Sequence, residues 1–180
     1  MTRTVEPGLI GLVLAGGRSA RMGSDKALLV WRGQTLLEHA RLLLRDAGCA
    51  TVRVVGRRDE PGGIADAEPF AGPARALLDA VCALGDEAKR LLVVPVDMPR
   101  LGVTDLAPLL DQDGAMGCHY QDQPLPFMVA CTALADVSRQ TRSIRSLLSA
   151  VGAHTIGLPA SRMSAFSNVN TLEDYGRLNV

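Results

Sequence analysis

The stretch LVLAGGRSARMGSDK, from Leu12 to Lys26, joins the end of an apolar run to a glycine-rich, basic loop. The run Leu9 to Leu14 stops at Gly16 and Gly17, which is typical of a strand buried on both faces of a parallel sheet. Glycines let backbone N–H groups approach phosphate oxygens closely, and Arg and Lys side chains neutralise the phosphate charge. The stretch therefore predicts a buried strand followed by a loop that can bind phosphate.

The spacing of this loop excludes the two commonest phosphate-binding motifs. The P-loop needs GxxxxGK[ST], but Gly17 and Gly23 are too far apart and Ser24 and Asp25 precede the lysine. The dinucleotide fingerprint needs GxGxxG, and the adjacent glycines here do not supply it. A solvated turn whose charges only face water is the alternative interpretation.

The composition is that of one globular domain covering residues 1–180. The chain is 47% apolar and 21% charged, and it holds 19 acidic and 19 basic residues, so no overall field attracts nucleic acid or an anionic membrane. Aromatic residues make up only 3%, which argues against a base-stacking surface. No apolar stretch is long enough to span a bilayer. We expect a cytoplasmic protein without nucleic acid or membrane partners.

The four cysteines show no metal-binding spacing. Cys49, Cys82, Cys118 and Cys131 form no CxxC pair, and the three histidines are far apart in the sequence. We expect buried free thiols in a reducing compartment.

Apolar patterning and cap signals predict strands that alternate with helices. Thr35 and Glu38 have capping-box spacing at the start of one helix, and Gly48 follows its end. This alternation predicts a three-layer αβα sandwich with a mostly parallel sheet. Strands are expected at 9–14, 52–55, 64–66, 91–96, 115–120, 126–131 and 154–158, and helices at 35–47, 74–84, 105–110, 143–151 and 171–178.

Ligands of such sheets bind beyond the carboxyl ends of the strands. Asp97 follows the most apolar strand, Leu91 to Val96, and would lie beside the glycine loop if the first and central strands are neighbours. The end of such a deeply buried strand is a rigid place for a metal ligand. A plain strand cap before Pro99 is the alternative role for Asp97.

Three segments resemble one family. LAGGRSARMGSDK, ending at Lys26, resembles the signature LAGGxSxRMGxDK of the MobA-like nucleotidyltransferases, the molybdenum cofactor guanylyltransferases. VPVDMPRL, Val94 to Leu101, is similar to their central strand with its terminal aspartate. FSNVNTLEDY, Phe166 to Tyr175, is similar to their NxNTPE segment, with Leu172 where proline is usual.

This resemblance implies a nucleotide-binding, Rossmann-like fold and a reaction. The family condenses GTP with molybdopterin, using Mg²⁺, to give a guanine dinucleotide cofactor and pyrophosphate. Other cofactor-biosynthesis proteins or molybdoenzyme chaperones are further implied partners. The implied site residues are Leu14, Ala15, Gly16 and Gly17 on the nucleotide, Arg21 and Lys26 on the phosphates, Asp66 on guanine, Asp97 on magnesium, and Asn168 and Asn170 on the pterin side; Lys26, Asp97 and Arg21 carry the catalysis.

Two departures from the family pattern leave alternatives open. The usual GPLAG segment is AGPARAL here, with Ala74, Arg75 and Ala76 after Pro73, and Gly56 replaces a polar residue. The alternatives are a CTP-dependent pterin enzyme, another nucleotidyltransferase such as one acting on sugar phosphates, and a nucleotide-binding module without catalysis. For Asn168 and Asn170, turn and helix-cap roles remain alternatives.

Overall fold

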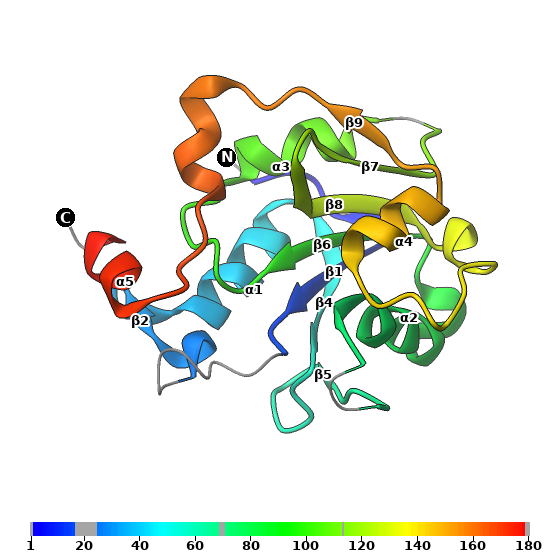
Figure 1. Cartoon of the computed structure of the whole chain (residues 1–180), viewed down its shortest axis with the longest axis horizontal. Coiled ribbons are helices and arrows are strands. Elements are labelled where there is room, and N and C mark those ends of the chain that lie inside the picture. Colours follow the sequence, from blue (N-terminus) through cyan, green and yellow to red (C-terminus); the bar gives the residue numbers. More distant parts are fainter. Residues whose placement is uncertain (1, 17–24, 69–70, 113, 179–180) are drawn as a thin grey trace.

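A computed structural model of the chain describes residues 2–16, 25–68, 71–112 and 114–178. Its centre is a seven-stranded sheet in the order β5-β4-β1-β6-β8-β7-β9 (Figure 1). The strands of this sheet are β1 (Glu6–Leu14), β4 (Cys49–Val55), β5 (Gly63–Ile64), β6 (Arg90–Pro95), β7 (Gly117–Tyr120), β8 (Gln123–Ala130) and β9 (His154–Ile156).

The sheet is mostly parallel, as the sequence predicts. Strands β5, β4, β1 and β6 form a continuous parallel block, and β9 pairs in parallel with β7. Strand β8 runs antiparallel to both of its neighbours, β6 and β7. Because β1 and β6 are adjacent, with Leu14 opposite Pro95, the ends of the first and central strands lie side by side.

Helices cover both faces of the sheet (Figure 1). Residues of α1 (Leu36–Asp46) and α3 (Val103–Leu110) share one buried cluster, and residues of α2 (Pro73–Leu84) and α4 (Ile144–Ala150) share the other. The predicted capping box of α1 is present, since the Thr35 hydroxyl accepts from the Glu38 N–H and the Glu38 carboxylate accepts from the Thr35 N–H. The three-layer prediction is confirmed.

The C-terminal segment returns to the region that follows β1. It comprises the 3-10 helix η4 (Ala160–Phe166) and helix α5 (Leu172–Leu178), which lies beside the small hairpin β2 (Val30–Trp31) and β3 (Gln34–Thr35). The Tyr175 hydroxyl donates to the Val30 carbonyl at 2.5 Å, and the Trp31 indole donates to the Leu178 carbonyl at 3.1 Å. These contacts hold α5 against the β2–β3 hairpin.

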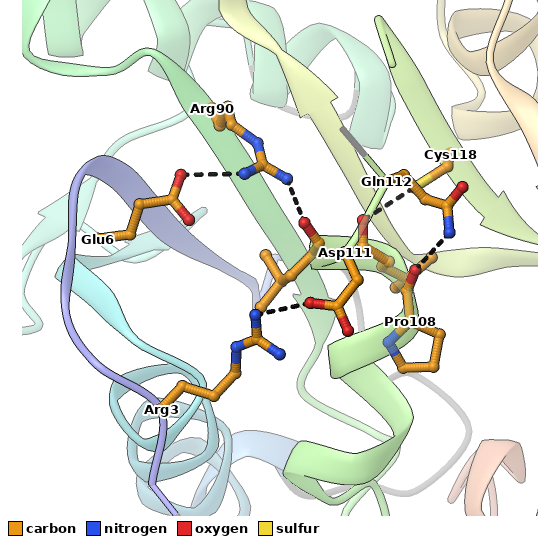
Figure 2. A network of polar contacts seen from close by, with 9 residues as sticks. Arg3, Glu6, Arg90, Pro108, Asp111, Gln112 and Cys118 are labelled. Carbon is orange, nitrogen blue, oxygen red and sulfur yellow. Dashed lines mark hydrogen bonds and ion pairs between the residues drawn. The ribbon is translucent and has the colours of Figure 1, made fainter. Parts of the chain in front are cut away.

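A polar network holds the opposite edge of the sheet, where β1 and β6 begin (Figure 2). Arg90 donates to Glu6 at 3.0 Å and to the carbonyl at the end of α3, Leu110 O, at 2.8 Å. Arg3 pairs with Asp111 at 2.7 Å. The network fastens the N-terminal segment to α3, far along the strands from their carboxyl ends.

Some expectations are wrong in detail. Strand β5 ends at Ile64, so Asp66 lies beyond it and not at its end. Strand β8 begins at Gln123, earlier than expected, because its prolines lie outside the part that pairs with β6. Only Cys49 and Cys118 are buried, since Cys82 is exposed and Cys131 is half-buried. The remaining 3-10 helices are η1 (Lys26–Leu28), η2 (Gly85–Glu87) and η3 (Cys131–Leu134).

No helix in the described part of the chain is long and apolar enough to cross a bilayer.

Candidate active site

The carboxyl ends of β1, β4 and β6 are held together one residue past the regular strands. The Ala15 N–H donates to the Val55 carbonyl at 3.2 Å, and the Val96 N–H donates to the Leu14 carbonyl at 3.2 Å. The backbone that leads into the glycine loop is therefore fixed by both neighbouring strands, which makes it a rigid platform for a ligand.

A pocket of about 320 Å³ opens at this edge of the sheet. It combines backbone from the end of β1, charged side chains after β1 and β6, and an apolar wall from α2 and β8. Its lining residues are Leu14, Ala15, Gly16, Asp25, Lys26, Ala27, Pro73, Pro95, Val96, Asp97, Met98, Gln123, Pro124, Leu125 and Asn168.

Lys26 and Asp97 form the charged centre of this pocket. The Lys26 ammonium lies 3.6 Å from Asp97 Oδ2 and donates to Asn170 Oδ1 at 2.7 Å. Both charged side chains are about one-fifth exposed, at 19% for Lys26 and 22% for Asp97. A cation and an anion thus face the same space and remain open to a ligand.

Burial raises the pKa of the Asp97 carboxyl above its usual value, and the nearby Lys26 charge opposes this effect. Desolvation favours the neutral acid, whereas a cation favours the carboxylate. A second cation at this carboxylate would therefore stabilise its charged form.

The segment 168–170 lies next to Asp97 at the pocket. The Val169 N–H donates to the Asp97 carbonyl at 2.8 Å, and the Val169 side chain is buried while Asn168 and Asn170 are exposed. Asn168 lines the pocket, and Asn170 accepts from the pocket residue Lys26. The Asn170 N–H also donates to Asp174 at 3.0 Å, so Asn170 belongs to the helix cap as well.

An ion pair between a buried carboxylate, Asp105, and an exposed guanidinium, Arg162, lies upstream of this segment in the chain. Asp105 is only 2% exposed and accepts two hydrogen bonds from the Arg162 guanidinium, at 2.7 and 2.6 Å. Asp105 also accepts from the Gly102 N–H, and its backbone carbonyl accepts from the Tyr120 hydroxyl. The charged pair is therefore well satisfied and fastens η4 to α3, upstream of segment 168–170.

Gly16 and Gly56 approach each other closely on the other side of the pocket. A Cβ atom on Gly56 would lie 2.5 Å from the Gly16 Cα, and Gly56 has a φ of +87°. Both observations demand glycine at position 56. The departure from the family pattern at this position thus has a backbone cause in this chain.

Asp66 points toward this pair of glycines. Its Oδ2 lies 3.5 Å from the place of a Cβ on Gly16, and its Oδ1 lies 3.6 Å from that of Gly56. Oδ1 is buried and has no hydrogen-bond partner among the described residues. Burial is the main cause that raises the pKa of Asp66, and the negative charge of Asp79 raises this pKa further. A buried acceptor left unpaired is costly, so this oxygen is suited to a donor from outside the described residues.

The residues around the pocket suit a metal that brings its own further ligands. Among residues 2–16, 25–68, 71–112 and 114–178, no group of three or more His, Cys, Asp or Glu side chains could enclose a metal ion. Asp97 offers one carboxylate at the pocket edge. That donor set fits Mg²⁺, which commonly binds through one or two carboxylates plus substrate phosphates and water.

The structure brings most of the predicted site residues together. Leu14, Ala15, Gly16, Lys26, Asp97 and Asn168 all line the pocket, and Asn170 reaches it through Lys26. Asp66 is outside the lining and lies behind Gly16. Gly17 and Arg21 fall outside the described residues.

Sequence reasoning did not assign a role to several lining residues. Asp25 belongs to the signature stretch and Pro73 to the AGPARAL segment, so their place in these motifs was a signal that could have marked both as site residues. Gln123, Pro124 and Leu125 reach the pocket from β8. No pattern marked them, because their position depends on the antiparallel pairing of β8 with β6 and β7.

Comparison with known proteins agrees with this geometry. Residues 11–156 match the model of the MobA-like NTP transferase domain. The molybdenum cofactor guanylyltransferase of Xanthomonas euvesicatoria is 42% identical over 176 residues, covering 93% of each chain. A probable molybdenum cofactor guanylyltransferase of Opitutus terrae is 33% identical, with 94% of each chain covered.

Solved structures share the fold. Molybdopterin-guanine dinucleotide biosynthesis protein A from Archaeoglobus fulgidus has a TM-score of 0.72 at 22% identity, covering 94% of this chain and 96% of that one. Rv0371c from Mycobacterium tuberculosis in complex with manganese has a TM-score of 0.67 at 19% identity, covering 96% and 98%. The family model and the sequence relatives together show that this chain is a nucleotidyltransferase and belongs to the MobA-like NTP transferase family.

Proposed function

We propose that the protein transfers GMP from GTP to the phosphate of molybdopterin in its molybdenum-bearing form, giving the guanine dinucleotide cofactor and pyrophosphate. The observation that carries this proposal is the pocket in which backbone from β1, the Lys26 ammonium and the Asp97 carboxylate converge. The names of the sequence relatives support the same reaction.

Asp66 is the proposed reader of guanine. Its buried Oδ1 is without a partner among the described residues, and its two oxygens lie near Gly16 and Gly56. Guanine offers two neighbouring donors, N1–H and the N2 amino group, whereas cytosine offers one amino group at the corresponding edge. A site built for both donors rejects a base that leaves an acceptor unpaired.

Lys26 is the proposed phosphate ligand, together with Arg21 of the signature stretch. The acceptor phosphate attacks the α-phosphorus of GTP in line, a new O–P bond forms, and the bond to the β-phosphate oxygen breaks to release pyrophosphate. The protein's task in such a transfer is alignment and charge neutralisation. The Lys26 ammonium supplies positive charge beside the α-phosphoryl oxygens.

Asp97 is the proposed ligand of Mg²⁺. The metal, when bound there with phosphate oxygens and water, would neutralise the phosphates and stabilise the leaving pyrophosphate. The partly buried carboxylate and its raised pKa support the need for a cation at this place. Asn168 and Asn170 are the proposed amides on the pterin side, which the exposure of both residues supports.

The departures in the AGPARAL segment do not favour another reaction. Ala74, in the first turn of α2, is fully buried, and Arg75 pairs with Asp79 at 3.0 Å and donates to the Arg139 carbonyl at 3.1 Å. Both residues thus have structural contacts that explain them. The CTP-dependent and non-catalytic alternatives gain no support from these positions.

Pyrophosphate release measured with GTP, CTP, ATP and UTP tests the proposal. Each reaction contains Mg²⁺ and molybdenum-bearing molybdopterin, and a matched reaction omits the acceptor. We expect acceptor-dependent release with GTP well above that with the other nucleotides. Faster release with CTP would contradict the guanylyl assignment, and nucleotide binding without any release would favour the non-catalytic module.

A further inference from the structure

Arg57 connects the two ends of the signature loop. It lies in the turn after β4, where its Nε donates to the Ala15 carbonyl at 3.3 Å and its Nη2 donates to Asp25 Oδ1 in an ion pair. Ala15 ends the platform of β1, and Asp25 immediately precedes Lys26. One guanidinium therefore spans from the entry of the loop to its exit. Neither Asp25 nor Arg57 has a role in the function proposed above.

Asp25 in turn orients the segment that begins with Lys26. Its Oδ1 accepts from the Ala27 N–H at 3.1 Å, which caps the first turn of η1. The Asp25 carbonyl accepts from the Leu28 N–H at 3.0 Å, and Ala27 is buried in the core. The direction of the Lys26 backbone thus depends on where Arg57 holds the Asp25 carboxylate.

This pair is more than an ordinary surface ion pair. The Arg57 side chain is 18% exposed and that of Asp25 is 38% exposed, and the guanidinium makes two hydrogen bonds at once. The Arg57 hydrogen bond lowers the pKa of Asp25 below its usual value. The carboxylate is therefore ionised at neutral pH and remains paired with the guanidinium.

The charge of Arg57 also matters for the pocket. Asp25 lines the space assigned to the triphosphate, where an uncompensated carboxylate would repel phosphate oxygens. Because Arg57 neutralises it, the acidic residue can serve as a structural anchor without weakening anion binding.

We propose that Arg57, acting through Asp25, is the positioning residue that sets Ala15 and Lys26 in their nucleotide-binding arrangement before GTP arrives. The proposal rests on the proposed function, because it assigns the nucleotide to this pocket. Holding a site in its bound arrangement reduces the conformational cost of binding. Loss of the Arg57 contacts therefore acts first on the affinity for GTP.

The first test compares Arg57→Met, Arg57→Lys and the matched control Arg58→Met, whose parent residue is the exposed neighbour. Hydrogen bonds to charged groups contribute enough that Arg57→Met should raise the Kd and KM for GTP roughly tenfold or more. The KM for the acceptor should stay at the parent value. Arg57→Lys should recover part of the affinity, and Arg58→Met should match the parent.

These readouts separate positioning from simple support of the fold. A variant that only lost folded protein would have a lower kcat in proportion to its active fraction, with the KM for GTP unchanged. A parent-like Kd for GTP in Arg57→Met would overturn the proposal. So would an equal rise in the KM values for GTP and acceptor.

A double-variant cycle tests the route through Asp25. Asp25→Asn keeps an oxygen that can cap Ala27 but removes the charge. If Arg57 acts through Asp25, the Kd of the double variant should not exceed that of Arg57→Met, because the uncompensated carboxylate is gone. If the losses in GTP affinity of the two single variants multiply in the double variant, Arg57 does not act through Asp25.

Calorimetric titration of GTP keeps this test distinct from that of the proposed function. If the parent binds GTP with Mg²⁺ but transfers nothing, the proposed function fails while the effect of Arg57→Met on binding still supports the positioning role. If the parent does not bind GTP, both proposals are overturned.

Discussion

The Lys26 ammonium lies 3.6 Å from the Asp97 carboxylate, although the two residues follow different strands of the sheet. The parallel pairing of β1 with β6 produces this meeting, because it brings the carboxyl ends of both strands to the same edge. In the proposed reaction each member exchanges this partner for a stronger one, phosphate for Lys26 and metal for Asp97. The pair thus marks the centre of the proposed site, and the following predictions test its parts.

Lys26→Ala should lower GMP transfer roughly tenfold to hundredfold, because a hydrogen bond to a charged group contributes about 1.5–3 kcal/mol. The variant should fold, because the lysine side chain is not part of the hydrophobic core. Steady-state rates and circular dichroism check both statements. Lys89→Ala, an exposed lysine at the opposite edge of the sheet, is the control. If Lys26→Ala turns over like the parent, Lys26 is not a ligand of the phosphates.

Asp66→Asn should lower kcat/KM for GTP much more than kcat/KM for CTP. The asparagine amide keeps one acceptor but presents N–H groups where guanine also presents donors. The ratio of kcat/KM for the two nucleotides is the measurement, and the exposed Glu68→Gln is the matched control. If kcat/KM falls equally for both nucleotides, Asp66 does not read the base.

The same substitution should stabilise the free protein at neutral pH. The pKa of Asp66 is raised by burial, so the ionised carboxylate weakens the fold above that raised pKa. As the pH falls through the raised pKa, the acid becomes neutral and the penalty disappears. Denaturant unfolding of parent and Asp66→Asn should therefore differ at pH 7 and converge toward pH 4. An unchanged difference across this range would mean that Asp66 carries no such penalty.

Gly56→Ala should destabilise the protein by more than the backbone cost alone. A left-handed conformation costs a non-glycine residue about 1–2 kcal/mol, and here the added Cβ would also meet Gly16 at 2.5 Å. Gly33→Ala is the matched control, because Gly33 has a φ of +81° and nothing within 4 Å of the added atom. The free energies of unfolding should separate the two variants. Equal losses would show that the approach to Gly16 relaxes without cost.

Local signals in the sequence predicted the parts of the fold that local physics determines. The Thr35 and Glu38 cap is formed as expected, and Leu91 to Val94 are fully buried, as their continuous apolar run indicates. Because β1 and β6 are neighbours, as the expectation for Asp97 required, Asp97 lies beside Lys26, the last residue of the signature stretch.

Other features depend on contacts between distant residues and could not be predicted. The Arg57–Asp25 pair joins two loops that carry no periodic pattern, and the antiparallel placement of β8 brings Gln123 to the pocket. Cys82 lies on α2 at an exposed position, although cysteine is usually buried. Residue type alone therefore gave the wrong expectation for this position. In each case the pairing of distant segments, not the local sequence, decides the outcome.

Magnesium binding to the parent and to Asp97→Asn, titrated with and without GTP, tests the central claim most directly: that this pocket joins nucleotide and metal. One carboxylate binds Mg²⁺ weakly alone and shares it with phosphates when nucleotide is present. We therefore predict tight binding only for the parent with GTP, loss of magnesium-dependent transfer in Asp97→Asn, and retention of metal-free GTP binding by that variant. If Asp97→Asn shows the magnesium dependence of the parent, Asp97 only caps its strand and the account of this site is wrong.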